Sequence, residues 1–527
     1  MNRTPFQEQV LQKLICHCPV YIVGGAVRDG LLNLPCDDLD AVIPLPLNKI
    51  EKIVTEIGYN PHRLGNHKQT VSLFMEEERI DLLELKTDFL TDALQRDFTI
   101  NAIYYDVRNQ TWIDPLGGGQ DLEARCLRAC GKAEERLEED PIRILRMIRM
   151  TVRYELKIDD ELWNAARANL TLLESCAAER TTGELKEILI SENALSGVRL
   201  LDELGYWSLA IPELVRLKGL TQNKYHTKDA WEHTLHVFSN TPSDLLLRLA
   251  GLLHDLGKWE TASRECRVQG LLERTGKDYY VGGFKLRGSI YPLFAGSYVE
   301  VLGGRLDNYP DQIVVKRIHP GKESKASFEW IPDGKRHFLM HEQESARLVK
   351  QILPRFRWSM FLSLPHRNGE QELILLIKHH MLGTITFMNE LRGGNWNDKE
   401  IRRKARRLAW DLGWNGQYFF PERITEFLGL WKADFWGGKT REIGDGERFE
   451  ALQEEMIKAA QALDSRWQMI DWHGFEQFTR KKGIGGERFG QFKAQIRRAL
   501  LVSGKDSLDE QFLEREYKII LKEHVRR

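Results

Sequence analysis

The sequence predicts an α+β protein in which a head domain of mixed strands and helices is followed by mostly helical domains. Its 527 residues are too many for one core, because single domains hold roughly 100–200 residues. Short apolar runs separated by Gly, Pro and Asn turns fill the first part of the chain, and helical periodicity begins near residue 134. A segment rich in Gly, Tyr and Val interrupts the helical pattern at residues 263–335.

These patterns give expected elements and a domain division. In the head, strands are expected at residues 20–23, 39–43, 70–75 and 79–85, and helices at residues 27–32 and 48–57. The division has four parts, which are a head at 1–132, a helical neck at 133–218, a third domain at 219–392 that contains the β-rich insert at about 263–335, and a helical tail at 393–527. No internal repeat or low-complexity tract is found.

Composition limits the classes of function. Acidic and basic residues nearly balance, 77 against 76, which excludes a globally basic nucleic-acid binder but permits local basic surfaces. The seven cysteines are scattered, as in a reduced, cytoplasmic protein. The N-terminus does not resemble a secretory leader, and no apolar run reaches membrane-spanning length, so we expect a soluble protein with no membrane partner. Nothing in the sequence points to a protein partner or an oligomeric state.

Two glycines and two aspartates in the head indicate a phosphate and metal site. Gly24 and Gly25 lie between a predicted strand and a predicted helix, where exposed backbone N–H groups suit phosphate. Asp38 and Asp40 are two apart on a strand, so their carboxylates share a face. Two Mg²⁺ ions held there, about 4 Å apart, would activate a 3′-hydroxyl and neutralise the transferred phosphate. Asp81 is a possible third ligand. The alternatives are an ordinary tight turn and a solvated acidic turn.

Further polar pairs follow. Asp97 and Asn101 are four apart and are expected on one helical face, where they would hold a ribose and triphosphate. Asp140 begins a predicted helix that carries arginines at three-residue and four-residue steps, so that one side is strongly cationic. Asp140 before Pro141 is also typical of an N-cap, and that role alone is the alternative. The arginines are Arg143, Arg146, Arg149 and Arg153.

Five motifs in this order resemble the class II tRNA nucleotidyltransferase and bacterial poly(A) polymerase family. The resemblance is densest over residues 20–155, and a weaker match continues at residues 179–185. The motifs are Gly-Gly-Ala-Val-Arg-Asp at 24–29, Asp-Leu-Asp at 38–40, Gln-Arg-Asp-Phe-Thr-Ile-Asn-Ala at 95–102, Asp-Pro-Leu-Gly-Gly at 114–118 and Glu-Asp-Pro-Ile-Arg at 139–143.

The resemblance implies a DNA polymerase β-like head and assigns roles to residues. Asp38 and Asp40 would bind catalytic Mg²⁺. The nucleotide would contact Gly24, Gly25, Arg28, Arg96, Asp97, Asn101, Glu139, Asp140, Arg143 and Arg146.

Base selection follows from the last of these motifs. In the family, the carboxylate and the arginine that correspond to Asp140 and Arg143 read the incoming base. Cytosine and adenine both present an amino donor beside a ring-nitrogen acceptor, which matches this pair. Uracil and guanine present the opposite pattern, which would cost roughly 1–3 kcal/mol for each unpaired group.

The implied function is template-independent addition of C and A nucleotides from CTP and ATP to the 3′ end of tRNA, with the tail holding the tRNA elbow. One departure bears on the product. About ten residues separate the strand at 79–85 from Arg96, where CCA-adding relatives have a longer loop that is associated with the switch from C to A. A CC-adding enzyme or a poly(A) polymerase is therefore the alternative. A basic, Gly-containing segment at residues 480–490 is either a phosphate contact or a solvated charged surface.

A second set of residues resembles the HD phosphohydrolase superfamily. Adjacent His254 and Asp255 are its signature, and His233, His341 and His380 fit the other positions. Imidazole and carboxylate ligands suit a divalent transition metal of unspecified identity. The final ligand in that superfamily is usually Asp, whereas this segment offers histidine, so a structural or vestigial site is the alternative to a catalytic one. A metal-dependent phosphohydrolase or phosphodiesterase is therefore the alternative to a nucleotidyltransferase, from a different class of enzyme.

Overall fold

The computed structural model describes residues 3–525 except 37, 65–69, 77, 223–228, 288–294, 322–324, 332–335, 383–397, 414–419, 438–444, 468–472, 485–491, 494, 497–498 and 500–508. The chain divides into two compact units. The first contains Met1–Pro212 with Arg355–Phe361, and the second contains Glu213–Pro354 with Leu362–Arg527. Among the described residues, no helix combines the length and apolar character needed to cross a membrane.

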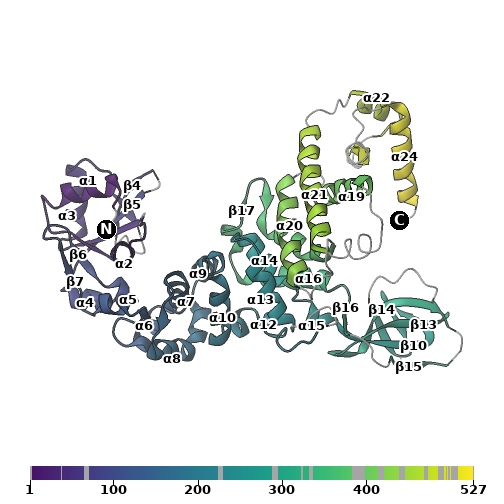
Figure 1. The fold of residues 1–527 in the computed structure, drawn as a ribbon, viewed down its shortest axis with the longest axis horizontal. Coiled ribbons are helices and arrows are strands. Elements are labelled where there is room, and N and C mark those ends of the chain that lie inside the picture. The colour runs from purple at the N-terminus through teal and green to yellow at the C-terminus, as the bar shows by residue number, and fades with distance from the viewer. Residues whose placement is uncertain are drawn as a thin grey trace. The chain divides into compact units, whose positions relative to one another are not determined.

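The head is built on a seven-stranded sheet with the order β3-β4-β5-β2-β1-β6-β7 (Figure 1). β2 pairs in parallel with β5 and antiparallel with β1, so the strand that carries the aspartates is central. The strands are β1 (Tyr21–Val23), β2 (Asp38–Ile43), β3 (His62–Leu64), β4 (Thr70–Met75), β5 (Glu78–Glu84), β6 (Tyr104–Asp106) and β7 (Thr111–Ile113).

The two faces of this sheet have separate cores. α1 (Pro5–Leu14) and α3 (Leu47–Glu56) bury their apolar residues with Ile22, Leu39 and Ile80. Val23 and Val42 face the other way, into a smaller cluster with Ala93 of α4 (Phe89–Leu94). This alternation follows from the two-residue period of a strand. The remaining head elements are α2 (Gly25–Leu31), the 3-10 turn η2 (Thr99–Asn101), α5 (Gly118–Glu123) and β8 (Cys126–Leu127).

The neck is helical, as its periodicity predicts. Its central helix, α7 (Arg143–Tyr154), buries apolar residues such as Ile144 and Ile148 and packs against α9 and α10. The other neck elements are α6 (Ala133–Glu139), β9 (Lys157–Ile158), α8 (Asp160–Ala168), η3 (Leu170–Ser175), α9 (Ala178–Ile190), α10 (Ala194–Leu204), α11 (Tyr206–Ala210) and α12 (Pro212–Val215).

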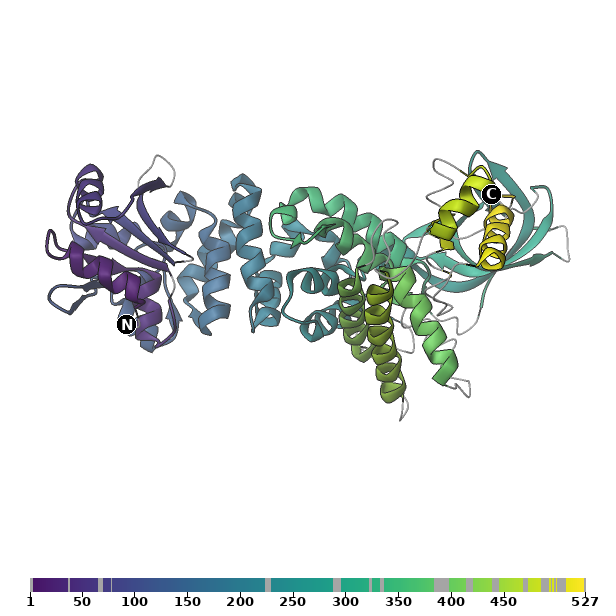
Figure 2. The same ribbon diagram turned by 90° about the horizontal axis from the view of Figure 1, so that it is seen from above.

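The second unit contains a group of packed helices (Figure 2). α13 packs against α14 and α20, and α14 also contacts α17, which packs on α16. The sequence division assigns α20 to a tail that begins at residue 393, whereas in the structure α20 packs with the helices of the preceding domain. The helices are α13 (Ala230–Asn240), α14 (Leu245–Leu253), α15 (Lys258–Thr261), α16 (His341–Ile352), α17 (Gly369–Lys378), α19 (Asp398–Gly413), α20 (Pro421–Gly437), α21 (Asp445–Trp467), α22 (His473–Lys481) and α24 (Glu510–Val525).

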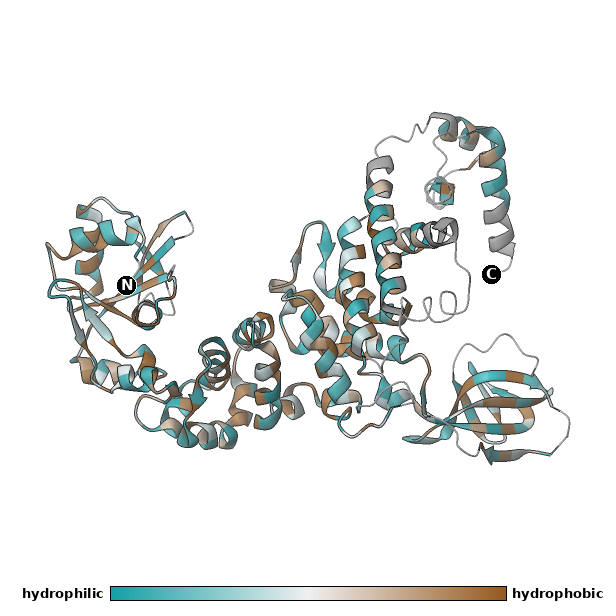
Figure 3. Cartoon of the chain, in the orientation of Figure 1, coloured by the Kyte–Doolittle hydropathy of each residue, from teal (hydrophilic) through white to brown (hydrophobic). Residues whose placement is uncertain are grey.

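Strands occupy the segment that the sequence predicts to be β-rich. They form a second sheet with the order β11-β12-β14-β13-β10-β15, and β16 pairs with β10. Apolar and polar residues alternate along these strands (Figure 3). The strands are β10 (Ala262–Thr275), β11 (Asp278–Val281), β12 (Phe284–Arg287), β13 (Tyr298–Leu306), β14 (Tyr309–Pro320), β15 (Ser327–Trp330) and β16 (Arg336–Phe338).

Candidate functional site

The turn between β1 and α2 brings bare backbone next to the aspartates. Gly24 has φ 77°, in the left-handed region that favours glycine. A Cβ atom at Gly24 would lie 3.4 Å from Oδ2 of Asp40, so the turn passes close to that carboxylate. Gly25 then begins α2. The turn and the carboxylate therefore face the same space.

Asp38 and Asp40 lie two residues apart on β2, as the sequence predicts. Burial and the nearby Asp81 together raise the pKa of Asp40 to about 6, although Arg96 partly opposes the rise. Two neighbouring carboxylates and partial burial disfavour the ionised form unless a cation is present. This electrostatic strain and the oxygen donors fit Mg²⁺.

Asp81 lies beside Asp40 in the register of β2 and β5. Its carboxylate already accepts hydrogen bonds at 2.6 Å from Oγ of Ser72 and at 2.9 Å from Nε of Arg79. Asp81 therefore has protein partners and acts on Asp40 through its charge. The structure does not favour it as a metal ligand.

A buried network joins the head to the neck. Arg28 donates to Oδ1 of Asn101 at 2.6 Å, and Nδ2 of Asn101 donates to Asp97 at 3.0 Å. The other oxygen of Asp97 pairs with Arg146 of α7 at 2.9 Å. Asp97 and Asn101 are thus together, as predicted.

The prediction that Asp97 and Asn101 lie on one face of an α-helix is wrong, because a 3-10 turn brings them together instead. Phe98 is extended, with φ −130° and ψ 148°, and forms a bridge with Ala129. This pairing prevents an α-helix across Phe98, and only Thr99–Asn101 is helical.

Tyr154 is a member of this network that the motifs did not reveal. Its ring lies 4.2 Å from the Arg28 guanidinium, and its hydroxyl accepts a hydrogen bond from Arg28. The same hydroxyl donates to Asp29 at 2.9 Å. Arg28 is only 5% exposed, so its guanidinium is held in one position. Its position at the end of the helix that carries the arginines was the available signal, but it is a weak one.

Asp140 has a specific partner. Its carboxylate accepts two hydrogen bonds from Arg180 of α9, at 3.0 and 2.7 Å. The structure does not support an N-capping role for its side chain, because Asp140 directly follows α6 and the N-cap of α7 is Ile142. Arg143 donates to the backbone carbonyls of Arg136 and Gln95, at 2.8 and 2.9 Å.

One cavity of about 650 Å³ collects most of these groups. Six arginines and five aspartates line it, so anionic phosphates would meet fixed guanidinium groups. Arg96, which pairs with Asp92 at 3.0 Å, is among them. Glu139, which pairs with Arg136 at 2.5 Å, and Asp81 do not line it. The lining residues are Gly24, Gly25, Arg28, Asp29, Pro35, Cys36, Asp38, Asp40, Arg96, Asp97, Asn101, Asp140, Arg143, Arg146, Arg149, Met150 and Arg153.

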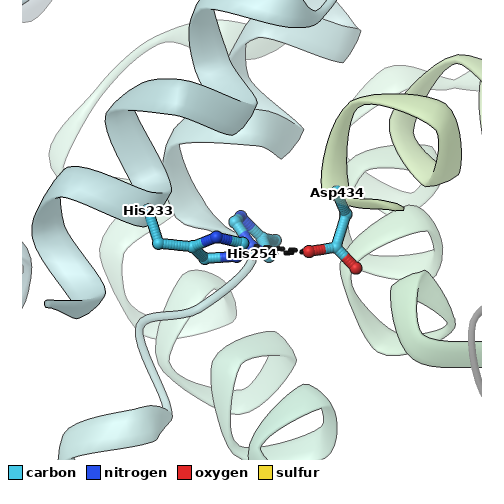
Figure 4. Close-up of side chains that lie close together, drawn as sticks. All are labelled: His233, His254 and Asp434. Carbon is cyan, nitrogen blue, oxygen red and sulfur yellow. Dashed lines mark ion pairs between the residues drawn. The ribbon is translucent and has the colours of Figure 1, made fainter. Parts of the chain in front are cut away.

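The second unit holds a buried centre of histidines and aspartates. Figure 4 shows His233 of α13, His254 after α14 and Asp434 of α20 pointing toward one another. Nε2 of His233 lies 3.2 Å from Oδ1 of Asp434, and Nε2 of His254 lies 3.1 Å from Oδ2 of Asp255. The five predicted residues are all at this centre, and Asp434 joins them. They are His233, His254, Asp255, His341 and His380.

Asp255 divides the centre into two donor sets. Its Oδ2 lies near His254 and at 3.4 Å from Nε2 of His233. Its Oδ1 lies 3.2 Å from Nε2 of His341 and 3.8 Å from Nε2 of His380. The side chains are almost fully buried.

Backbone carbonyls orient three of the imidazoles. Nδ1 of His254, His341 and His380 lies 2.9, 2.8 and 2.7 Å from a carbonyl oxygen. This contact assigns the hydrogen to Nδ1 and leaves Nε2 as the donor atom toward the centre, which is the usual arrangement of metal-binding histidines. Burial and the charges of His254 and His341 lower the pKa of His380 to about 3, so its ring is neutral. The donor set fits a divalent transition metal.

Burial by itself would raise the pKa of Asp255. The neighbouring His254 and Lys258 outweigh burial and hold this pKa well below its ordinary value, so the carboxylate is ionised. Nζ of Lys258 lies 2.6 Å from Oδ2.

Asp434 is the residue of this centre that the sequence prediction missed. The prediction gave the last position to His380 and placed residue 434 in a separate tail. A signal was present, because Asp434 stands directly between the apolar residues Ala433 and Phe435, and charged residues are rarely buried without a partner.

The basic segment near the C-terminus is partly described. Lys481 pairs with Glu510 at 2.7 Å and Lys482 with Glu514 at 3.0 Å. Residues 485–490 of the predicted contact lie outside the described residues.

The seven-stranded head sheet and the paired aspartates beside an arginine-rich cavity are the features expected of the nucleotidyltransferase class. Comparison with known proteins identifies its family. A model described as "Poly A polymerase head domain" matches residues 20–91 and 83–128, and one described as "Probable RNA and SrmB- binding site of polymerase A" matches residues 155–217. The chain belongs to the class II tRNA nucleotidyltransferase and poly(A) polymerase family.

Named relatives include different kinds of enzyme. The chain is 31% identical over 376 residues to the CC-adding tRNA nucleotidyltransferase of Thermus thermophilus, covering 67% of this chain and 84% of the relative. It is 34% identical over 254 residues to the A-adding tRNA nucleotidyltransferase of Deinococcus radiodurans, covering 46% of this chain and 58% of the relative. The chain thus spans less than two thirds of that second relative.

Solved structures agree on the fold. The Bacillus stearothermophilus CCA-adding enzyme in complex with CTP aligns with a TM-score of 0.56 at 18% identity, covering 99% of this chain and all of that one. The Thermotoga maritima CCA-adding enzyme complexed with tRNA aligns with a TM-score of 0.54 at 16% identity, covering 98% of this chain and 96% of that one.

Proposed function

We propose that the protein adds C and A nucleotides from CTP and ATP to the 3′ end of tRNA without a nucleic-acid template, releasing pyrophosphate. The observation that carries this proposal is the single cavity that joins Asp38 and Asp40 to Asp140 and Arg143. The relatives named above act on tRNA, which supports the choice of substrate. The seven cysteines are free, which supports a location in the reducing cytoplasm.

Asp38 and Asp40 would hold Mg²⁺. The metal would supply charge neutralisation at the transferred phosphate and activation of the primer hydroxyl. Arg28, fixed by Tyr154 and Asn101, and Arg96, fixed by Asp92, present guanidinium groups whose positions are set before the triphosphate arrives. Such fixed groups lose little conformational freedom on binding.

Asp140 and Arg143 would select the base. A carboxylate offers about four acceptor sites, so Asp140 can accept the amino group of cytosine or adenine while Arg180 holds it. Arg143 offers a donor to the adjacent ring nitrogen once one of its carbonyl contacts is exchanged. The pair therefore matches C and A and mismatches U and G.

The segment before Arg96 bears on the product. The residues between β5 and Arg96 include the short helix α4, whose N-cap Asp88 accepts from the backbone of Thr91 at 3.0 Å. We keep CC-only addition as the alternative within this proposal, and poly(A) addition as the alternative on other RNA.

The proposal is tested by replacing Asp38 with Asn in the full-length protein. Asparagine has nearly the same shape as aspartate but lacks the negative charge that would bind Mg²⁺. Incorporation of labelled CTP into tRNA should therefore fall to background, while tRNA binding measured by filter retention should stay the same. Asp160→Asn, an exposed aspartate in the first turn of α8, is the matched control and should stay active. Undiminished incorporation by Asp38→Asn would refute the assignment.

We further propose that the centre around Asp255 binds divalent transition metal and hydrolyses phosphate esters. The observation that favours this second activity is the pair of donor sets that face opposite oxygens of Asp255. A divalent ion there would make hydroxide available near neutral pH. Lys258, held by Gln222 at 2.7 Å, would add a positive charge for a phosphate.

Metal analysis of the purified protein tests this second proposal. After loading with Mn²⁺ and removal of free metal, His233→Gln should lose bound manganese, and hydrolysis of a model phosphodiester should fall with it. His236→Gln, on the same helix but outside the centre, is the control. Equal metal content in the two variants would contradict the metal site. Unmodified protein that holds manganese but does not hydrolyse the phosphodiester would contradict the activity.

A further inference from the structure

The strands of the insert close into a barrel. β10 pairs antiparallel with β11, β11 with β12, and β13 with both β14 and β10. The ring is completed by β12 and β14, which pair in parallel. Figure 1 shows these strands grouped as one body. A five-stranded barrel with this order is the topology of the OB-fold, which binds oligonucleotides or oligosaccharides beside the loop between its fourth and fifth strands.

The interior of the barrel is apolar along most of its length. Cys266, Val268, Val301 and Ile313 are fully buried there. β15 extends the wall beside β10, where Phe328 pairs with Val268 and Trp330 pairs with Cys266. Residues in register face the same side of a sheet, so Phe328 and Trp330 lie on the inner side with the core.

Near the turn between the fourth and fifth strands, arginine and aromatic groups replace the aliphatic core. Phe284 and Phe328 stack at 5.0 Å with an interplanar angle of 24°. The Arg305 guanidinium lies 5.3, 5.4 and 5.9 Å from the rings of Phe284, Phe328 and Trp330. Arg264 lies 4.8 Å from the ring of Trp330. We call Arg264, Phe284, Arg305, Phe328 and Trp330 the stacking platform.

The platform is accessible and cationic. Trp330 is 38% exposed, and the Arg264 side chain is 58% exposed. Among the described residues, no carboxylate forms an ion pair with Arg305, whereas Arg264 contacts Asp307 at 3.3 Å. A half-buried guanidinium held by aromatic rings offers its unused donors to an anion.

The insert as a whole carries an excess of positive charge, like the stacking platform. Residues 262–338 contain 13 Lys and Arg against nine Asp and Glu, whereas the full chain has a net charge of −1. Proteins that bind single strands combine such a positive surface with rings on which bases stack. An oligosaccharide would not need the excess positive charge.

We propose that the barrel is a binding module for single-stranded RNA, in which a base stacks on Trp330 and Arg264 and Arg305 contact the phosphates. The choice of RNA rests on the proposed function of the head, because that reaction requires an unpaired RNA 3′ end. The barrel itself needs no catalytic residue of the head. Its contribution is affinity for the single strand.

The test is fluorescence anisotropy of a labelled ten-nucleotide single-stranded RNA with the full-length protein. Trp330→Ala and Arg264→Ala should each weaken binding by about tenfold, since a stacked base is worth on the order of a five-fold to hundred-fold change. Tyr298→Ala and Arg274→Ala, exposed residues elsewhere on the barrel, are matched controls and should bind like the unmodified protein.

The outcomes separate this proposal from the function of the head. Asp38→Asn, whose effect is on nucleotide addition, should bind the oligonucleotide normally whether or not the head is a tRNA enzyme. The proposal would be overturned if Trp330→Ala bound the RNA as tightly as the unmodified protein, or if Tyr298→Ala lost as much affinity as Trp330→Ala. It would also be overturned if a double-stranded RNA of the same length bound as tightly as the single strand. Circular dichroism with the same melting curve for Trp330→Ala and Tyr298→Ala excludes unfolding as the cause of a selective loss.

Discussion

Asp140 and Arg143 have partners before any nucleotide is present. Arg180 holds the Asp140 carboxylate through two hydrogen bonds, and backbone carbonyls hold the Arg143 guanidinium. The carboxylate is therefore fixed in orientation while keeping free acceptor sites. Under the proposed function, this preorganisation would let the two side chains select a base without a template strand.

Asp140→Ala should relax this selection. Without the carboxylate, the amino group of cytosine or adenine loses its acceptor, and the penalty against uracil falls by about 1–3 kcal/mol. Competition between CTP and UTP in primer extension should show the ratio of incorporation falling roughly fivefold or more. Glu135→Ala, an exposed residue paired with Lys132, should leave the ratio unchanged. A ratio in Asp140→Ala equal to that of the unmodified protein would contradict the assigned role.

The residues that short motifs reveal are those whose neighbours in sequence are also their neighbours in space. Asp38 and Asp40 lie on one strand, and their carboxylates could be paired from the period of that strand. Tyr154 and Asp434 reach their sites only through packing of distant elements. Linear spacing could not place them.

At the scale of elements, α5 sets the position of the turn that carries Asn101. The Asp114 carboxylate accepts hydrogen bonds from the backbone N–H groups of Gly118 and Gly119, both at 2.8 Å. A Cβ atom at Gly118 would lie only 2.1 Å from the carbonyl oxygen of Thr99. Glycine at this position allows α5 to pack directly on η2.

Gly118→Ala should destabilise the protein. Overpacking against backbone costs typically about 1–3 kcal/mol, because neither side can rotate away. Urea unfolding should show a lower midpoint, and the apparent KM for CTP should rise because Asn101 is displaced. Gly119→Ala is the control, since its Cβ would meet a side-chain oxygen of Asp114 at 3.3 Å and cause a smaller loss. Equal stability of Gly118→Ala and the unmodified protein would argue against this packing.

Elements dominated by local periodicity were predictable. The strands near residues 20–23, 39–43 and 70–75 and the neck helices form where apolar periods indicate them. The α-helix expected around Asp97 does not form, because Phe98 forms an isolated β-bridge with Ala129. Tertiary pairing thus overrides a local pattern.

At the scale of the molecule, the two units carry separate chemistry. The arginine-lined cavity belongs to the first unit, and the histidine centre and the barrel belong to the second. The sequence predicted a β-rich insert. Its closure into a barrel depends on the parallel pairing of β12 with β14, which the sequence of neither strand alone indicates.

The most direct test of the central claim is extension of tRNA transcripts that end at the discriminator base, after the first C or after the second C, with CTP and ATP supplied separately and together. We predict that CTP extends the shortest transcript by at most two nucleotides, that any A is added only after both C residues, and that UTP and GTP are not used. No extension of any transcript, or a long run of A on each of them, would contradict the account.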